Sequence, residues 1–520
     1  MKFERKSGIL LHPTSLPGPD GIGDLGPEAY RWIDFLAESG TQLWQILPLG
    51  PTGYGDSPYQ CFSAFAGNHY LINPLMLLED GLLKLSDLKE RPDFTVEEVD
   101  FGPVIEWKIK LINKAFNAFI EQEDSKLRPD FEQFVDSKRS WLEDYALFMA
   151  IKETQDLHSW TEWPQPLKTR DPEALAEIRE NLGSTIEKHK FSQFLFFRQW
   201  AKLRDYTHNK GVQIIGDMPF VISMDSSDVW ANPELFLLDK ELKPTFVAGV
   251  PPDYFSVTGQ LWGNPLYNWQ VHQESNFAWW VARLRSILEL VDMVRLDHFR
   301  GFAASWHVPF GNETAIQGEW IHGPAVELFS EFKGNFPNLP IIAEDLGVIT
   351  PDVESLRDSF ELPGMKVLQF AFSGDPEDDF LPHHYPMHCV AYTGTHDNNT
   401  AQGWYNDATA FEQEFCRDYL NFSEPDRASW AMIRTIWQSV ANYTVAPIQD
   451  FLGYGIEARF NVPGTTDGNW RWRMRSDALT PELAKSIRKL NLIYGRLSTH
   501  EKQSYTNWLA SRLGDSVKPH

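Results

Sequence analysis

The stretch that decides the fold is 291–302, which reads Val291-Asp292-Met293-Val294-Arg295-Leu296-Asp297-His298-Phe299-Arg300-Gly301-Phe302. Its first half has the apolar spacing of a strand, and its second half breaks into a loop that contains a glycine. Because Arg295 and Asp297 are two residues apart, both side chains leave one face of the strand's end. An adjacent cation favours the charged form of an acid, and an ionised carboxylate is what a nucleophile needs. The alternative is a buried ion pair that only stabilises the end of the strand.

Seven further apolar runs repeat this strand pattern along the chain. They lie at 8–13, 42–48, 211–217, 339–344, 366–372, 389–393 and 439–445, and helical or loop segments separate most of them. Eight such strands predict an α/β fold of the (β/α)8, or TIM, barrel type, whose active site lies at the carboxyl ends of the strands. A doubly wound sheet needs fewer strands and usually a glycine-rich phosphate-binding turn, which this sequence lacks.

We expect the whole chain, 1–520, to form a single elaborated catalytic barrel with large, mainly helical insertions in its βα loops. Between the second and third strands, at about 53–205, the chain is far longer than one crossover helix requires, which predicts an inserted subdomain. A further insertion at about 221–290 is expected to carry a loop of the substrate groove. Helical periodicity covers 103–120 and 191–209, and Pro27 and Gly40 are placed to begin and end a helix between the first two strands.

The composition excludes several kinds of partner. The net charge is -25, from 47 basic and 72 acidic residues, and no strongly basic tract balances it. This argues against a nucleic acid or an anionic membrane and favours a neutral or cationic ligand. Three cysteines, Cys61, Cys389 and Cys416, lack the spacing of a metal site or a disulfide framework, so they indicate free thiols and a cytoplasmic location. The apolar run near the start is too short for a signal peptide, and no segment reaches membrane-spanning length.

Three of the predicted strands end in acids, namely Asp297, Glu344 and Asp397. In a barrel these carboxyl groups converge on one bowl, together with Arg295 and His396. Since clustered acids cannot all ionise cheaply, at least one of them should have a raised pKa. One ionised carboxylate and one protonated acid are the groups that glycosidic bond chemistry requires.

The charge beside each acid predicts its role. Asp297, next to Arg295, is the expected nucleophile, and Glu344, which has no cation immediately before it, is the expected general acid and base. Asp397 and His396 are left to hold the hydroxyl groups of the donor sugar. A metal site is the competing interpretation, but these segments have no paired-histidine spacing and no calcium-loop pattern. We therefore expect neither a metal nor an external cofactor.

The same segments resemble a known group of enzymes. Three sequence regions shared by α-amylase-type retaining glycosidases are similar to Val294-Arg295-Leu296-Asp297, to Glu344 after its strand, and to His396-Asp397. The resemblance is closer to the amylomaltases, or 4-α-glucanotransferases (disproportionating enzymes). It extends over nearly the whole chain, through 10–16, 53–59, 216–219, 228–233, 250–255 and 459–465.

The resemblance also implies roles for individual residues. It makes Asp297 the nucleophile, Glu344 the acid and base, and Asp397 a third acid that binds and distorts the donor sugar. It implies donor-site contacts for Arg295, His396 and Asp217, and contacts around the substrate groove for Ser57, Tyr59, Asp253, Trp262 and Asn461. For Trp262 the alternative is a tryptophan of the core.

We therefore expect a 4-α-glucanotransferase that moves α-1,4-glucan segments between maltodextrins by a retaining double displacement. The alternatives are an α-amylase-like glucan hydrolase and a catalytically inactive glucan-binding protein. An ordinary α-amylase has Asn-His where this chain reads Asp217-Met218-Pro219-Phe220, which favours the transferase, and the three acids argue against a pure binder. Loops at 249–265 and 53–59 are expected to shield the intermediate from water. The oligomeric state is left open.

Overall fold

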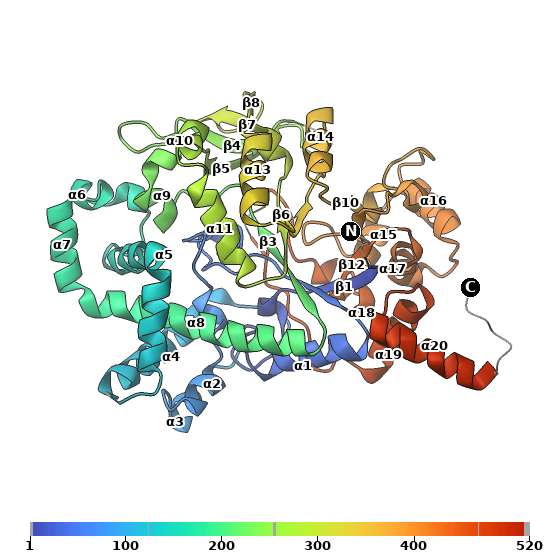
Figure 1. Ribbon diagram of the computed structural model, residues 1–520, viewed down its shortest axis with the longest axis horizontal. Coiled ribbons are helices and arrows are strands. Elements are labelled where there is room, and N and C mark those ends of the chain that lie inside the picture. Colours follow the sequence, from blue (N-terminus) through green and yellow to red (C-terminus); the bar gives the residue numbers. More distant parts are fainter. Residues whose placement is uncertain (1–3, 123, 253–255, 466, 514–520) are drawn as a thin grey trace.

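The predicted strands form one parallel, eight-stranded sheet that curves into a barrel (Figure 1). The computed structural model describes residues 4–122, 124–252, 256–465 and 467–513. Around the barrel the strands follow in the order β10, β11, β12, β1, β2, β3, β6 and β9. Their bounds are β1 Lys6–Leu10, β2 Leu43–Gln45, β3 Gln213–Met218, β6 Met293–Leu296, β9 Ile341–Ala343, β10 Gly364–Val367, β11 Cys389–Tyr392 and β12 Tyr443–Pro447. The expected (β/α)8 architecture is confirmed.

The register of the barrel brings the neighbouring strands β12 and β2 close to the backbone of β1 at Gly8. This residue lies between Val445 of β12 and Leu43 of β2, and a Cβ atom added to it would meet the Leu43 Cβ at 2.9 Å. On the far side, the Ala343 N–H donates to the Pro363 carbonyl at 2.9 Å, which joins β9 to the residue before β10. The barrel is therefore nearly closed.

Alternate residues of the barrel strands fill its interior. This inner core contains Leu10, Leu43, Ile215, Ile342, Met365, Val367, Val390, Tyr392 and Val445. The intervening residues, such as Ile9 and Trp44, belong to a second, larger core that includes Trp32 of the first helix. Period-two alternation thus separates an inner from an outer core, as a closed sheet requires. Each fully buried side chain of this kind stabilises the fold by about 1.5–3 kcal/mol.

Two of the predicted strand runs contain helical backbone in the structure. The run 366–372 continues after β10 as a 3-10 helix, Leu368–Phe370, in which the Gln369 side chain donates to the Asn399 carbonyl at 2.9 Å. The run 439–445 joins β12 only from Tyr443, because the Ser439 N–H still donates to the Thr435 carbonyl of the preceding helix at 3.2 Å. Apolar content alone placed these strand ends wrongly.

Helices occupy most of the segment between β2 and β3. They are α2 Pro74–Glu79, α3 Leu85–Leu88, α4 Phe101–Glu121, α5 Arg128–Thr154, α6 Gln165–Lys168, α7 Pro172–Asn181 and α8 Gly183–Asn209. The helices expected at 103–120 and 191–209 are α4 and α8, the second of which begins earlier than expected. Figure 1 shows α4 to α7 gathered on one side of the barrel, and α8 runs from them towards α1. The bounds 53–205 and 221–290 for separate insertions stay predictions.

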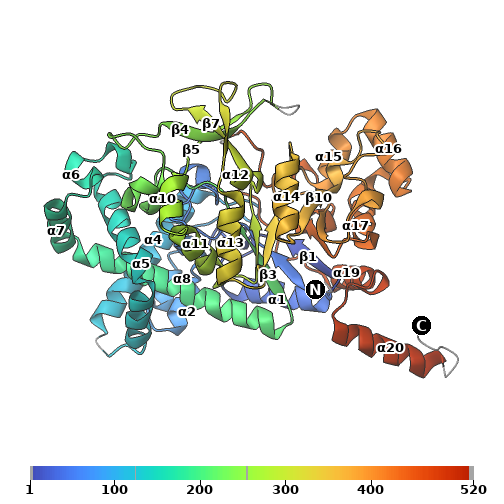
Figure 2. The same ribbon diagram turned by 45° about the horizontal axis from the view of Figure 1, so that its top comes forward.

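A second, antiparallel sheet lies at the edge of the molecule shown at the top of Figures 1 and 2. Its order is β5, β4, β7 and β8, with bounds β4 Phe246–Val250, β5 Gln260–Pro265, β7 Ala304–Pro309 and β8 Glu319–His322. The sequence did not predict this sheet. Its β4–β7 pair joins segments on either side of β6. All four residues of β8 are exposed, so this strand has no alternation of buried and exposed positions.

The remaining helices pack around the barrel or extend from it. The first is α1 Pro27–Glu38, as expected from Pro27 and Gly40. The others are α9 Ser227–Ala231, α10 Trp269–Glu274, α11 Ala278–Leu288, α12 Arg300–Ala303, α13 Ala325–Asn335, α14 Pro351–Ser359, α15 Ala401–Asp407, α16 Ala410–Leu420, α17 Ala428–Gln438, α18 Ile448–Leu452, α19 Pro481–Ile493 and α20 Thr499–Leu513. Within the described ranges, no helix combines the length and the apolar character needed to cross a membrane.

Candidate active site

The three predicted acids lie at the carboxyl end of the barrel. Asp297 directly follows β6, Glu344 directly follows β9, and Asp397 lies in the loop after β11. Backbone hydrogen bonds continue past the strand ends, because the Asp297 N–H donates to the Met218 carbonyl and the Glu344 N–H to the Leu296 carbonyl, each at 3.1 Å. The rigid sheet therefore positions both acids.

Arg295 joins two acids from neighbouring strands. Its Nη1 donates to Asp217 Oδ2 at 2.7 Å, and its Nη2 lies 2.9 Å from Asp297 Oδ1. Tyr59 completes this group, since its hydroxyl also donates to Asp217 Oδ2 at 2.7 Å. Arg295 and Asp217 are buried, whereas 27% of the Asp297 side chain is exposed. Of the two acids that Arg295 contacts, Asp297 is thus the one that a ligand can reach.

The electrostatic setting of Asp297 differs from the expectation. Burial raises the pKa of Asp297 to about 7, Arg295 opposes this shift, and Asp217 and Asp397 add to it. The prediction that Arg295 by itself keeps Asp297 charged at neutral pH was therefore too strong, because it ignored desolvation and the other two acids. Near neutral pH both forms of Asp297 are populated.

Glu344 is also shifted towards its protonated form. Burial raises the pKa of Glu344 well above its usual range, with Arg295 opposing and Asp297 adding to the shift. Its direct polar partner is the His298 N–H, which donates to Glu344 Oε2 at 2.7 Å, whereas Asp297 has a guanidinium group at 2.9 Å. Burial therefore raises the pKa of both acids, and only Asp297 has a guanidinium group in direct contact to oppose this shift, in agreement with the predicted raised pKa.

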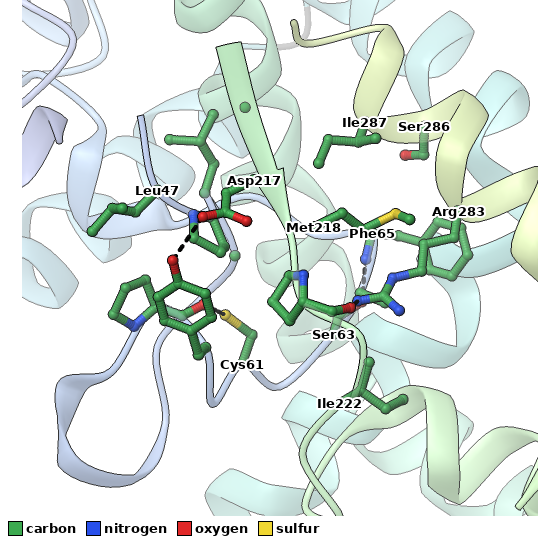
Figure 3. A pocket seen from close by; sticks show the side chains of 18 of the residues that line it. Leu47, Cys61, Ser63, Phe65, Asp217, Met218, Ile222, Arg283, Ser286 and Ile287 are labelled. Carbon is green, nitrogen blue, oxygen red and sulfur yellow. Dashed lines mark hydrogen bonds between the residues drawn. The ribbon is translucent and has the colours of Figure 1, made fainter. Parts of the chain in front are cut away.

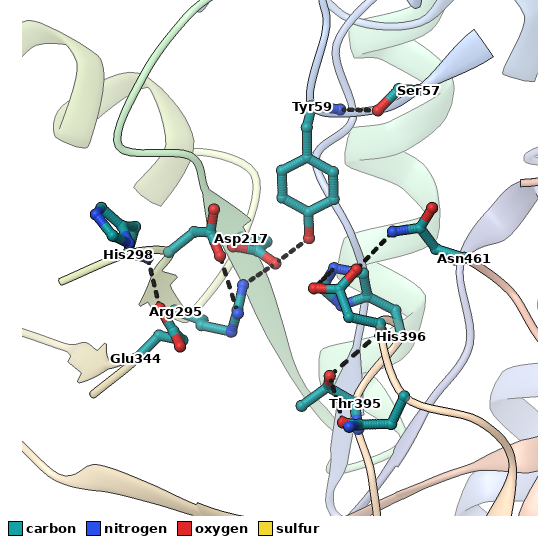
Figure 4. Close-up of polar contacts among 12 residues, drawn as sticks. Ser57, Tyr59, Asp217, Arg295, His298, Glu344, Thr395, His396 and Asn461 are labelled. Carbon is teal, nitrogen blue, oxygen red and sulfur yellow. Dashed lines mark hydrogen bonds and ion pairs between the residues drawn. The ribbon is translucent and has the colours of Figure 1, made fainter. Parts of the chain in front are cut away.

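Asp397 has a separate set of partners, His396 and Asn461, which lie on the opposite side of Arg295 and Asp217 from Glu344 (Figure 4). Asn461 Nδ2 donates to Asp397 Oδ1 at 2.6 Å, and His396 Nε2 lies 3.2 Å from Asp397 Oδ2. The Tyr59 ring stacks on His396 with ring centroids 5.2 Å apart. Five predicted residues from four separate segments therefore meet here: Tyr59, Asp217, His396, Asp397 and Asn461.

The remaining predicted contacts are less closely tied to the acids. The Ser57 hydroxyl accepts a hydrogen bond from the Tyr59 N–H at 3.2 Å, so its observed partner is in its own loop. Trp262 packs edge-on against His298, with ring centroids 4.8 Å apart, which places it beside Glu344. Asp253 lies outside the described residues. The roles of all three stay predictions.

His298 is a site residue that the sequence analysis did not select. It has a left-handed backbone, with φ 51°, which costs energy in a residue other than glycine. That conformation accompanies the hydrogen bond from its N–H to Glu344, and its ring contacts Trp262. Burial lowers the pKa of His298 to about 3, so the ring is neutral. Its position directly after Asp297 was the available signal.

A pocket lies against Asp217 (Figure 3), and Tyr59 also lines it. Its volume is about 70 Å³, and residues such as Leu47, Cys61, Met218, Ile222, Arg283 and Ile287 line it. Asp217 Oδ1 is buried and has no hydrogen-bond partner among the described residues. The described residues also contain no group of three or more His, Cys, Asp or Glu side chains arranged to hold a metal ion.

Known proteins with similar sequences and structures show which family the chain belongs to. A family model described as 4-alpha-glucanotransferase matches residues 11–480. The 4-alpha-glucanotransferase of Thermus thermophilus is 50% identical over 497 residues, covering 94% of this chain and 99% of its own. That of Synechocystis sp. is 47% identical over 503 residues, covering 96% and 100%. The amylomaltase from Streptococcus agalactiae in complex with acarbose has a TM-score of 0.93 at 40% identity, covering 95% of this chain and 100% of that one. The chain therefore belongs to the 4-alpha-glucanotransferase family.

Proposed function

We propose that the chain transfers α-1,4-glucan segments by a retaining double displacement in which Asp297 and Glu344 do the chemistry. In the first step a carboxylate oxygen of Asp297 attacks the anomeric carbon of the donor. The bond from that carbon to the glycosidic oxygen breaks, and Glu344 gives this oxygen its proton. The leaving sugar departs with a free 4-hydroxyl, and a covalent glycosyl ester stays on Asp297.

The second step reverses the first with a new partner. The 4-hydroxyl oxygen of an acceptor glucan attacks the anomeric carbon while Glu344 takes the hydroxyl proton, and the ester bond to Asp297 breaks. Two inversions give net retention, and atoms and charge balance without a cofactor. The observation that carries this proposal is the contrast between Asp297, with Arg295 at 2.9 Å, and Glu344, whose pKa burial raises well above its usual range.

We assign the donor sugar to the side of the site where Asp397 lies. Asp397 is 41% exposed on its side chain, and Asn461 at 2.6 Å and His396 at 3.2 Å orient it. An oriented carboxylate accepts hydrogen bonds from sugar hydroxyl groups, and contacts that strengthen as the ring distorts favour the transition state. Tyr59 connects this side of the site to the ion pair of Arg295 and Asp217, because its ring stacks on His396 and its hydroxyl donates to Asp217.

Replacing Tyr59 by Phe is expected to lower kcat/KM for maltotriose by roughly tenfold or more. The change removes the hydroxyl that donates to Asp217 at 2.7 Å, and a hydrogen bond to a charged group contributes about 1.5–3 kcal/mol. The ring and its stacking on His396 remain. Steady-state kinetics and a thermal unfolding midpoint measure the two effects. Tyr54→Phe is the matched control in the same loop, because it removes the same group from a tyrosine that is 77% exposed, and equal losses in both variants would contradict a specific role for the Tyr59 hydroxyl.

Transfer exceeds hydrolysis only if water is kept from the ester and an acceptor is held in place. The segment 53–59 contributes Tyr59, whose ring covers His396. The segment 249–265 contributes Trp262, which contacts His298 beside Glu344. These contacts support the proposal that the two loops shield the site from opposite sides.

Incubation of the purified protein with maltotriose tests the proposed reaction. Transfer yields glucose together with a ladder of longer maltodextrins. Glucose and maltose without longer products would assign the chain to the hydrolases, and binding without any products would make it a glucan-binding protein. Product analysis by anion-exchange chromatography over time separates these outcomes.

The proposed reaction also indicates the substrates and the cellular location of the chain. Donor and acceptor would be neutral maltooligosaccharides or longer α-1,4-glucans, which suits a chain of net charge -25 better than a polyanion does. Cys389 and Cys416 are buried and Cys61 is partly buried, and all three are free thiols. Free thiols support a reducing, cytoplasmic location.

A further inference from the structure

The edge strand β8 carries an exposed tryptophan that the proposed mechanism does not use. Trp320 is 37% exposed, and it pairs across the sheet with Trp306, with ring centroids 5.3 Å apart. Isolated large aromatic side chains are usually buried, so a partly exposed one held by fixed neighbours is unusual. The contacts of Trp320 connect it to the active site.

Arg300 links Trp320 to the loops of both catalytic acids. Its guanidinium carbon lies 3.8 Å from the centre of the Trp320 ring, and its Nη1 donates to the Val348 carbonyl. Arg300 is three residues beyond Asp297, and Val348 is four residues beyond Glu344. An extended chain advances about 3.3–3.6 Å per residue, so Val348 lies within about 15 Å of Glu344. The Trp320 ring is therefore fixed to the rim of the bowl.

The direction of the glucan chain follows from the arrangement of the acids. In Figure 4, His396 and Asn461 lie on one side of Arg295 and Asp217, and Glu344 and His298 lie on the other. The donor sugar occupies the first side under the proposed function. Because Glu344 protonates the oxygen between donor and leaving group, the acceptor leaves the bowl past Glu344.

The contacts of Arg300 place Trp320 beside the loop that follows Glu344. The Val348 carbonyl, which Arg300 binds, belongs to the loop that leaves Glu344. An aromatic ring packs against the apolar C–H face of a sugar. The Arg300 guanidinium group stacked on the Trp320 ring makes this ring a platform for a sugar, and such a platform does not require a charged ligand.

We propose that Trp320, supported by Arg300, binds acceptor sugars beyond the first one and so sets the preference for long acceptors. This inference rests on the proposed transferase function. It assigns Trp320 a binding role, and Arg300 acts as a positioning residue through its contact with the ring. Short acceptors, which do not extend to the rim, gain nothing from the platform.

The test uses an α-maltotriosyl fluoride donor, whose leaving group occupies no acceptor position. Glucose and maltohexaose serve as acceptors, and the measured quantity is the ratio of kcat/KM for maltohexaose to that for glucose. Trp320→Leu keeps apolar bulk but removes the aromatic face. It is expected to lower this ratio about fivefold to tenfold, which is the size of one lost aromatic contact. Trp320→Phe is expected to recover most of the ratio.

Ile321→Ala is the matched control, because Ile321 is the next residue on β8, has the same exposed fraction of 37%, and faces the other side of the sheet. It is expected to leave the ratio unchanged. An unchanged ratio in Trp320→Leu, or equal losses in both variants, would overturn the inference. A change of oligomeric state in Trp320→Leu, seen by light scattering, would also overturn it by assigning β8 to a subunit interface.

The experiments separate a failure of the transferase function from a failure of the binding role of Trp320. If the wild type forms no longer products from any acceptor, the transferase function itself fails. If the wild type does form them and the acceptor preference does not depend on Trp320, only the platform is wrong. Calorimetric titration of maltohexaose into Asp297→Asn, with and without Trp320→Leu, gives a second readout that does not depend on turnover. Weaker binding in the double variant supports the platform, and equal binding contradicts it.

Discussion

Asp297→Asn is expected to lower kcat for maltotriose disproportionation by at least about 10⁴-fold, the scale seen when a catalytic nucleophile is removed. An amide cannot form the glycosyl ester. It can still accept the hydrogen bond from Arg295 Nη2 at 2.9 Å, so the local geometry is retained. Longer maltodextrins measured by chromatography, with the enzyme at high concentration, give the residual rate.

The same variant should not lose stability. Burial raises the pKa of Asp297 to about 7, so the folded protein holds a proton there that the unfolded chain releases at lower pH. Asp297 therefore contributes stability below its unfolded pKa, and this contribution is lost as the pH rises through about 7. Above that pH, a neutral amide removes an unfavourable buried charge, and the thermal midpoint should stay level or rise.

Asp292→Asn is the matched control for this prediction. Asp292 precedes the same strand at its opposite end, where its carboxylate accepts the Ile214 N–H at 2.7 Å and contacts His208 at 3.0 Å. In a barrel, that end serves stability and the carboxyl end serves catalysis. Asp292→Asn should lower the thermal midpoint and keep activity. Retention of more than about 1% activity by Asp297→Asn would exclude Asp297 as the nucleophile.

Glu344→Gln is expected to have a large effect that depends on the donor. With maltotriose, kcat should fall by about 10²–10⁴-fold, because the leaving sugar needs a proton. With α-maltotriosyl fluoride, fluoride leaves without protonation, so the first step should continue. The second step lacks its base, and the glycosyl ester should accumulate. Intact-protein mass spectrometry would detect one added maltotriosyl unit.

Asp345→Asn is the control for Glu344→Gln, because the two acids are adjacent in the sequence. The Asp345 carboxylate accepts hydrogen bonds from Arg357 at 2.6 Å and from the Met365 N–H at 2.7 Å. Loss of the Asp345 carboxylate should therefore lower the thermal midpoint and reduce the rates with the two donors by the same factor. Equal impairment of Glu344→Gln with both donors, without an accumulating ester, would show that Glu344 is not the acid.

The pH profile gives a further check on both assignments. The reaction needs Asp297 charged and Glu344 protonated. On the acid side, kcat/KM should fall as Asp297 gains its proton, with a midpoint near the pKa of about 7. On the alkaline side it should fall as Glu344 loses the proton that burial retains. With the fluoride donor, the alkaline limb of the first step should be absent in Glu344→Gln.

Much of the site followed from short-range patterns. Period-two spacing placed Arg295 and Asp297 on one face of β6, and the structure confirms their contact at 2.9 Å. The position of each acid after an apolar run placed Asp297, Glu344 and Asp397 at one end of a barrel. These inferences hold because a strand's side-chain directions and a parallel sheet's common end depend only on local geometry.

Other features depended on contacts between distant segments. Arg295 is shared with Asp217, which is 78 residues away, and the Tyr59 hydroxyl joins Asp217 from 158 residues away. The antiparallel sheet pairs β4 with β7 across the barrel strand β6. No pattern within one segment specifies such partners, because pairing energy depends on which surfaces meet after folding.

The sequence by itself determined the eight-strand barrel, the positions of the three acids and the Arg295–Asp297 pair, because side-chain periodicity and strand direction are local properties. Only the tertiary structure decided how these groups are charged. The pKa of Asp297 rises because burial and the acids Asp217 and Asp397 outweigh Arg295, and burial likewise raises the pKa of Glu344. Desolvation is a property of everything packed around a carboxyl group, so it exists only once distant segments have come together.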